Sequence, residues 1–186
     1  MLGEKEHILD FILFRNLIEE AGIDYVIYFG TLLGAKRNKT LIPWDDDIDF
    51  VIYRGATKIP VLELLLVEQK FVKIRHEGDV ITYQKNDIRF DLYIFKLKFI
   101  NYKCNDYIIP RMYLNNVESI NMYGVNFSTP GNVVKVLTSL YGLSWRVPNK
   151  ILSASPVRFN YRVKIFLKNK IIPAKLYNFV RRVVRR

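Results

Sequence analysis

The stretch IPWDDDIDF, residues 42–50, places four aspartates within five consecutive positions. Neighbouring ionised carboxylates repel one another, and a site that keeps them together usually holds a divalent cation or shifts their pKa values. From Asp47 onward acidic and apolar residues alternate, which predicts a β-strand with Asp47 and Asp49 on one face. Two such carboxylates lie about 6 to 7 Å apart at their Cα atoms, so they can converge on one ion.

A strand and a tight turn are predicted just before this acidic run. Residues 25–29, YVIYF, are β-branched or aromatic and end at Gly30, which is typical of a buried strand that meets a turn. A short helix is expected to begin at Thr31. Backbone N–H groups at Gly30 and Thr31 would let a phosphate approach closely, as at other helix N-termini.

A second alternating stretch supplies a third carboxylate. In residues 88–95, IRFDLYIF, the apolar side chains face one way and Asp91 faces the other, so a strand neighbouring the first is predicted. Carboxylate oxygens suit Mg²⁺ or Mn²⁺, and a pair of such ions can hold the reacting oxygens of a phosphoryl transfer. We therefore predict Asp47, Asp49 and Asp91 as metal ligands and catalytic residues, with Asp91 as ligand or as base for the attacking hydroxyl.

The remaining pattern predicts one α/β (α+β) domain, a small mixed sheet packed by helices. Helices are expected at residues 5–21, 58–70, 130–141 and 171–184, a hairpin at 71–84, and turns with short strands at 101–128. We assign residues 1–150 to a catalytic domain. Residues 151–186 form a basic C-terminal extension, expected to be helical and packed on the same domain.

Charge is distributed unevenly along the 186 residues, whose net charge is +11. All 18 acidic residues lie at or before Glu118, whereas lysine and arginine continue to Arg186. A basic, acid-free end of this kind can meet an anionic membrane, a phosphorylated polymer or nucleic acid. Cys104 is the only cysteine, and no apolar stretch is long enough to span a bilayer. We expect a cytoplasmic protein, soluble or peripheral at the membrane.

Other interpretations of the acidic run fit less well. A calcium loop that starts at Asp45 would need glycine and glutamate where Phe50 and Ala56 stand. A solvated turn paired with nearby lysine and arginine remains open, because charge runs are often only wet surface. His7 and His76 have no partner at zinc-ligand spacing. No motif of nucleic-acid-binding modules accompanies the basic residues.

Three segments resemble the LicD/fukutin family of phosphotransferases. They are FGTLLGAKR (residues 29–37), IPWDDDIDF (residues 42–50) and the distal YGLSWRVP (residues 141–148), so the resemblance covers roughly residues 20–150. Gly30-Thr31 corresponds to the Gly-Ser/Thr turn of the nucleotidyltransferase superfamily, Asp47-Ile48-Asp49 to its Asp-x-Asp strand, and Asp91 to its third carboxylate. The chain departs from the family where Leu143-Ser144 replaces acidic residues.

The resemblance implies a nucleotidyltransferase-like fold and a magnesium-dependent transferase. Such an enzyme would move a phospho-alcohol, phosphocholine or an alditol phosphate, from a CDP-linked donor to a hydroxyl of a glycan or lipid-linked glycan, as in cell surface polysaccharide modification, and release CMP. Substrate contacts are expected from Gly30, Thr31, Lys36, Arg37, Trp44 and Arg89. The alternatives are a nucleotidyltransferase that uses a nucleoside triphosphate, and a non-catalytic basic module that binds nucleic acid.

Overall fold

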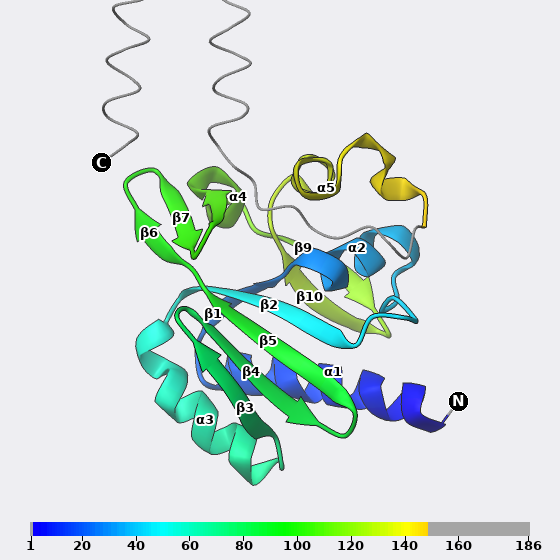
Figure 1. The fold of residues 1–186 in the computed structure, drawn as a ribbon, viewed down its shortest axis with the longest axis vertical. Coiled ribbons are helices and arrows are strands. Elements are labelled where there is room, and N and C mark those ends of the chain that lie inside the picture. The colour runs from blue at the N-terminus through cyan, green and yellow to red at the C-terminus, as the bar shows by residue number, and fades with distance from the viewer. Residues whose placement is uncertain (1, 149–186) are drawn as a thin grey trace, which may run out of the picture. The chain divides into compact units, whose positions relative to one another are not determined.

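Helices and strands make up most of residues 2–148, the part of the chain that this computed structural model describes (Figure 1). In chain order they are α1 (Leu2–Glu20), β1 (Asp24–Ile27), α2 (Phe29–Asn38), β2 (Asp47–Arg54), the 3-10 helix η1 (Ala56–Lys58), α3 (Ile59–Glu68), β3 (Val72–Glu77), β4 (Val80–Lys85), β5 (Ile88–Ile94), β6 (Lys96–Lys98), β7 (Asn101–Cys104), β8 (Tyr107–Pro110), α4 (Arg111–Asn115), β9 (Glu118–Met122), β10 (Val125–Thr129), α5 (Val133–Tyr141) and the 3-10 helix η2 (Leu143–Arg146). The predicted α/β class is confirmed.

The main sheet has five strands in the order β1-β2-β5-β4-β3. β2 and β5 pair in parallel, whereas the other three pairs are antiparallel. A parallel pair needs a long crossover connection, and α3 with the β3–β4 hairpin lies between β2 and β5 in the chain. The two strands predicted to carry the acids are therefore interior neighbours in a mixed sheet, as the alternating patterns indicated.

Aromatic side chains form the core between α1 and one face of the sheet. The ring of Phe14 on α1 lies 5.3 Å from that of Phe50 on β2 and stacks on that of Phe90 on β5 at 4.6 Å. Phe11, one turn earlier, stacks on Phe127 of β10 at 4.2 Å and so joins the β9–β10 hairpin to the same core. All five of these rings are fully buried. These rings exclude water from this face of the sheet, so an active site can lie only on the opposite face.

Helix α2 packs against the other face of β2. Its Leu32, Leu33 and Ala35 are buried, and the hydroxyl of Thr31 accepts a 2.8 Å hydrogen bond from the backbone N–H of Asp49. The helix ends at Lys39, whose left-handed backbone lets its N–H reach the carbonyl of Ala35. α2 thus directs its N-terminal turn toward the acidic residues of β2.

Two smaller sheets flank the main one: β6-β7-β8, and the β9–β10 hairpin. β6 follows β5 almost without interruption. On β8, the ring of Tyr107 lies 4.8 Å from that of Phe29 at the start of α2 and 6.3 Å from that of Tyr93 on β5. The β6-β7-β8 sheet is therefore anchored beside the N-terminus of α2.

The boundaries differ from the sequence expectations at one place that matters. The strand expected at residues 25–29 ends at Ile27, and α2 begins at Phe29, two residues before the predicted start and with φ 42°. Tyr28 still donates its N–H to the carbonyl of Asp49 at 3.1 Å, so the chain turns into the helix straight from the last sheet contact. α2 continues through Asn38.

The predicted C-terminal helix at residues 171–184, and the domain boundary near residue 150, lie outside the described residues or at their end and stay predictions. Within residues 2–148, no helix combines the length and hydropathy needed to cross a membrane.

Phe14→Ala is expected to lower the free energy of unfolding by about 3–5 kcal/mol, because it removes a fully buried ring that contacts both central strands. Urea denaturation measures this change. Leu9→Ala on the same helix is the control, since Leu9 is 58% exposed, and its effect should stay within about 0.5 kcal/mol. Equal losses in the two variants would contradict the packing of α1 through Phe14.

Candidate active site

Three carboxylates meet at the centre of the sheet. In the parallel pairing, Asp49 on β2 lies opposite Asp91 on β5, and Asp47 lies opposite Arg89. One carboxylate oxygen from each of Asp47, Asp49 and Asp91 lies within 4.8 Å of the other two. Asp49 and Asp91 are buried, at 4% and 6% exposure, whereas Asp47 is half-buried. The structure brings together the three acids that the sequence singled out.

Asp49 is held from α2 by two hydrogen bonds. The N–H of Gly30 donates to Oδ2 of Asp49 at 3.1 Å, and the N–H of Asp49 donates to the hydroxyl of Thr31 at 2.8 Å. A Cβ atom at Gly30 would come within 2.2 Å of Oδ2 of Asp45, so glycine is the residue that leaves room for this carboxylate. The Gly30-Thr31 turn therefore positions the acids.

Asp91 is held by side chains of the neighbouring strands β4 and β3. The hydroxyl of Thr82 on β4 donates to Oδ1 of Asp91 at 2.6 Å, and a guanidinium nitrogen of Arg75 on β3 lies 3.4 Å from Oδ2. Arg75 also donates to the hydroxyl of Thr82 at 3.1 Å. Sequence reasoning missed Arg75 and Thr82, because only the register Arg75–Thr82–Asp91 across three strands reveals them. They fix the orientation of Asp91.

The crowded acids favour a positive ion between them. Burial, and then the charge of Asp47, raises the pKa of Asp49 well above its ordinary value. Burial, followed by repulsion from Asp91, also raises the pKa of Asp47. Burial and the neighbouring Asp47 raise the pKa of Asp45 to about 7. A divalent cation would offset this repulsion, and a donor set made only of carboxylate oxygens fits a hard, oxygen-seeking ion.

Tyrosine rings surround the carboxylates on the side away from the aromatic core. Burial, with the charge of Asp49 as the next cause, raises the pKa values of Tyr93 on β5 and Tyr141 on α5. Both hydroxyls thus stay neutral near the acids. Tyr93 also contacts Phe29, at 4.9 Å between ring centroids. These rings limit the water around Asp49.

The expected substrate residues divide into two groups. Gly30 and Thr31 contact Asp49, as described above. At the rim of the same site, Arg89 pairs with Asp46 at 2.8 Å, and Trp44 is 46% exposed. The roles of Trp44 and Arg89 in substrate binding stay predictions.

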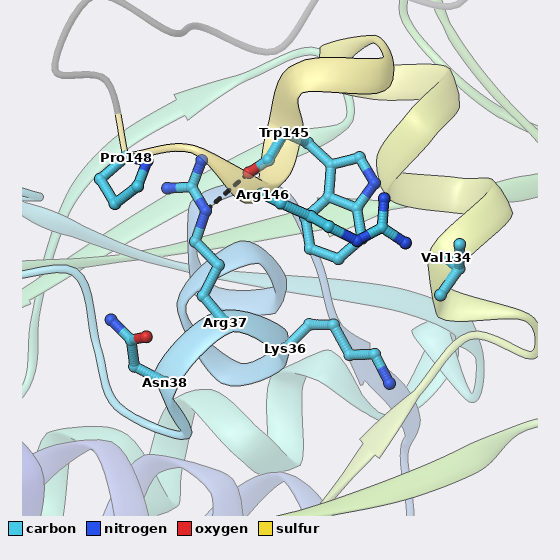
Figure 2. A pocket seen from close by; sticks show the side chains of 7 residues that line it. All are labelled: Lys36, Arg37, Asn38, Val134, Trp145, Arg146 and Pro148. Carbon is cyan, nitrogen blue, oxygen red and sulfur yellow. Dashed lines mark hydrogen bonds between the residues drawn. The ribbon is translucent and has the colours of Figure 1, made fainter.

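Lys36 and Arg37 do not lie beside the acids. They are six and seven residues after Gly30 on α2, about 9 to 10 Å along the helix axis. Both line a separate open pocket of about 320 Å³ between the C-terminal half of α2, α5 and η2, which Figure 2 shows from close by. Arg37 donates from Nε to the carbonyl of Trp145 at 2.6 Å and from a terminal nitrogen to that of Val147 at 2.9 Å. Arg37 therefore joins α2 to η2, and its contact with a donor stays a prediction.

Asp49→Asn is expected to raise the melting temperature of the cation-free protein near about pH 8, and by much less near about pH 5. Because folding raises the pKa of Asp49, its ionised form costs stability above that pKa, and the cost vanishes as the pH falls and the carboxyl takes up a proton. Thermal melts in a chelator measure the difference.

Added magnesium or manganese should reverse the order, raising the melting temperature of the wild type but not of the variant. Asp87→Asn, an exposed carboxylate in the β4–β5 turn, is the matched control and should show neither effect. A wild type that is more stable than Asp49→Asn in chelator near about pH 8 would contradict the repulsion inferred among the three acids.

Comparison with known sequences points to one family. Residues 22–132 match the family described as LicD/FKTN/FKRP, nucleotidyltransferase domain. Lipopolysaccharide cholinephosphotransferase LicD of Haemophilus influenzae is 50% identical over 48 residues, which are 26% of this chain and 17% of that protein. Ribitol 5-phosphate transferase FKRP of Mus musculus is 28% identical over 149 residues, 68% of this chain and 29% of that protein. The chain thus spans less than a third of the length of these relatives.

Solved structures support the fold. The crystal structure of ANT(2″)-Ia in complex with adenylyl-2″-tobramycin has a TM-score of 0.55 at 14% identity, covering 97% of each chain. The solution structure of the antibiotic-resistance factor ANT(2″)-Ia has a TM-score of 0.58 at 12% identity, covering 98% of this chain and 92% of the other. At these identities the likeness concerns the fold alone, which is that of nucleotidyltransferases. On its matched residues, the chain belongs to the LicD/FKTN/FKRP family and carries that family's nucleotidyltransferase domain.

Proposed function

We propose that this protein transfers a phospho-alcohol, phosphocholine or an alditol phosphate, from a CDP-linked donor to a hydroxyl of a glycan. The observation that carries the proposal is the convergence of Asp47, Asp49 and Asp91 beneath the Gly30-Thr31 turn. Relatives named as a cholinephosphotransferase and as ribitol 5-phosphate transferases support the class of group transferred. An acid cluster buried in a sheet and supported by donors on both sides is not a solvated surface turn.

Asp47, Asp49 and Asp91 would hold Mg²⁺, or Mn²⁺ in its place. When bound, the ion neutralises charge on the transferred phosphoryl group and on the leaving oxygen. The chain's own residues do the remaining work. Gly30 has no Cβ and so leaves room for the Asp45 carboxylate beside Asp49. The N–H of Gly30 and the hydroxyl of Thr82 orient the carboxylates of Asp49 and Asp91, and the hydroxyl of Thr31 fixes the backbone of Asp49.

The reaction balances as a single displacement at phosphorus. The acceptor hydroxyl oxygen forms a bond to the phosphorus that carries the alcohol, and the bond from that phosphorus to the bridging oxygen breaks. CMP leaves with the bridging oxygen, and the hydroxyl proton passes to a carboxylate of the cluster. Asp91 serves as the third ligand or as this proton acceptor, and its orientation by Arg75 and Thr82 suits both roles.

The acceptor that we propose is a glycan or lipid-linked glycan of a cell surface polysaccharide, modified on the cytoplasmic side of the membrane. Arg89 and Trp44 at the rim are proposed to contact the donor's phosphates and its base or sugar. Lys36 and Arg37, about 9 to 10 Å along α2 from Gly30, are better placed for a more distant part of a substrate.

A rival within the enzyme class is attack on the α-phosphate of a nucleoside triphosphate by means of the same acids. It is favoured by the fold likeness to ANT(2″)-Ia, whose structure holds an adenylylated tobramycin. The two reactions release different products, CMP from a CDP-alcohol and pyrophosphate from a triphosphate, so one assay separates them.

We expect magnesium-dependent release of CMP when the protein is given CDP-choline or a CDP-alditol with a mixture of glycan acceptors. Asp47→Asn should lower this rate by about a hundredfold or more, since the residue would hold the ion on which the phosphoryl charge depends. Circular dichroism should show an unchanged fold.

Asp87→Asn, which removes an exposed carboxylate at the β4–β5 turn, should keep the wild-type rate. Chromatography of the nucleotides is the measurement. Release of pyrophosphate from CTP or ATP, with CDP-alcohols untouched, would replace this proposal by its rival. Full activity in Asp47→Asn or in a chelator would remove the proposed site.

A further inference from the structure

The β6–β7 hairpin carries apolar side chains into solvent. Phe99 and Ile100 form the two-residue turn between the strands and are 97% and 74% exposed. Leu97 on β6 is 46% exposed, and Met112 at the start of α4 is 61% exposed. The N–H of Arg111 donates to the carbonyl of Ile100 at 3.3 Å, which places α4 against the turn. We call Leu97, Phe99, Ile100 and Met112 the hairpin tip.

The backbone of Phe99 is as unusual as its exposure. Its φ of 55° lies in the left-handed region, where hairpin turns favour glycine, asparagine or aspartate. Neither burial nor turn chemistry accounts for a phenylalanine at this position. A backbone held in this region marks Phe99 as a candidate for a functional contact.

Cations lie beside and behind the hairpin tip. Lys98 adjoins the turn and Arg111 donates to it, whereas Lys103 lies farther back on β7, opposite Lys96. Lys98, Lys103 and Arg111 are exposed, and none of the three forms an ion pair within residues 2–148. Lys96 is paired with Asp79 at 2.5 Å. The acid nearest in sequence on this hairpin unit, Asp106, lies in the β7–β8 turn at the other end of β7. The tip is thus apolar at its point and positive at its sides.

From this arrangement we infer that the hairpin tip inserts into an anionic lipid bilayer. Apolar side chains at the point would enter the boundary of the acyl chains, and the lysines and arginine would contact the anionic headgroups. A protein partner fits less well, because a stable protein interface buries about 1,000 Å² or more, and a convex tip of four side chains offers little such area. Charge complementarity selects anionic lipid.

Insertion of the hairpin tip would place the active site close to the membrane surface. Asp91 and Phe99 are eight residues apart, so at about 3.3 Å per residue they are separated by at most about 26 Å. Tyr107 of the same small sheet contacts Phe29 at the start of α2. A membrane-bound tip would therefore hold the acids within reach of a lipid-linked acceptor. This last step rests on the proposed function, whereas the membrane contact itself does not.

Co-sedimentation of the full chain with vesicles tests the inference. Vesicles of phosphatidylcholine alone are compared with vesicles that also contain phosphatidylglycerol. The wild type should bind the anionic vesicles more tightly. The double variant Phe99→Asn/Ile100→Ser should lower the partition coefficient by about tenfold or more, because two apolar side chains no longer enter the lipid. Asparagine tolerates the left-handed backbone, so the melting temperature should be unchanged or higher.

The basic residues beyond 148 are present in every variant, so the difference between variants reports the hairpin tip alone. Lys98→Gln/Lys103→Gln should reduce the preference for anionic vesicles. Leu64→Ser removes an apolar side chain of 68% exposure from α3 and should bind like the wild type.

Wild-type binding by the double variant, or an equal loss in Leu64→Ser, would overturn the inference. So would a dimer, seen by analytical ultracentrifugation, that Phe99→Asn dissociates, because the tip would then be an interface between copies of the chain. Vesicle binding does not depend on CMP release, so a failure of the proposed chemistry would leave this result unaffected.

Discussion

The parallel pairing of β2 with β5 sets Asp49 directly opposite Asp91, and the active-site face depends on this one register. Successive side chains of a strand point to opposite faces, so a slip of one residue would turn Asp91 into the aromatic core. Two buried carboxylates this close are tolerated only with donors around them. Gly30, Thr82 and Arg75 supply these donors from both sides of the pair.

The same alternation explains how the fold sustains a repulsive site. Phe50 follows Asp49 and Phe90 precedes Asp91, so each strand presents a carboxylate to one face of the sheet and an aromatic ring to the other. Those rings pack against Phe14 of α1. Burial of several aromatic side chains stabilises the sheet by more than the crowded acids destabilise it. The same alternation on β2 and β5 therefore builds both the acidic face and the core face of the sheet.

The sequence predicted the acid-bearing strands because alternation of acidic and apolar residues can be recognised within a single segment. Contacts that depend on pairing between segments could not be predicted from the sequence. The contact of Arg75 with Asp91 requires β3, β4 and β5 in register, and the early start of α2 follows from the contact of Tyr28 with β2. Lys36 was expected to contact substrate; the helical rise places it in the C-terminal half of α2, beside a separate pocket, and its role stays a prediction.

The length of α2 also explains how residues 29–37 and the distant segment 141–148 form one structural unit. α2 begins at the acids, where Gly30 contacts Asp49, and ends where Arg37 donates to the carbonyls of Trp145 and Val147. Trp145 is itself fixed, because its indole N–H donates to the hydroxyl of Thr138 on α5. The segment at residues 141–148 therefore supports α2 at its C-terminal end. Since α2 carries the Gly30-Thr31 turn, a contact far from the acids helps to determine their position.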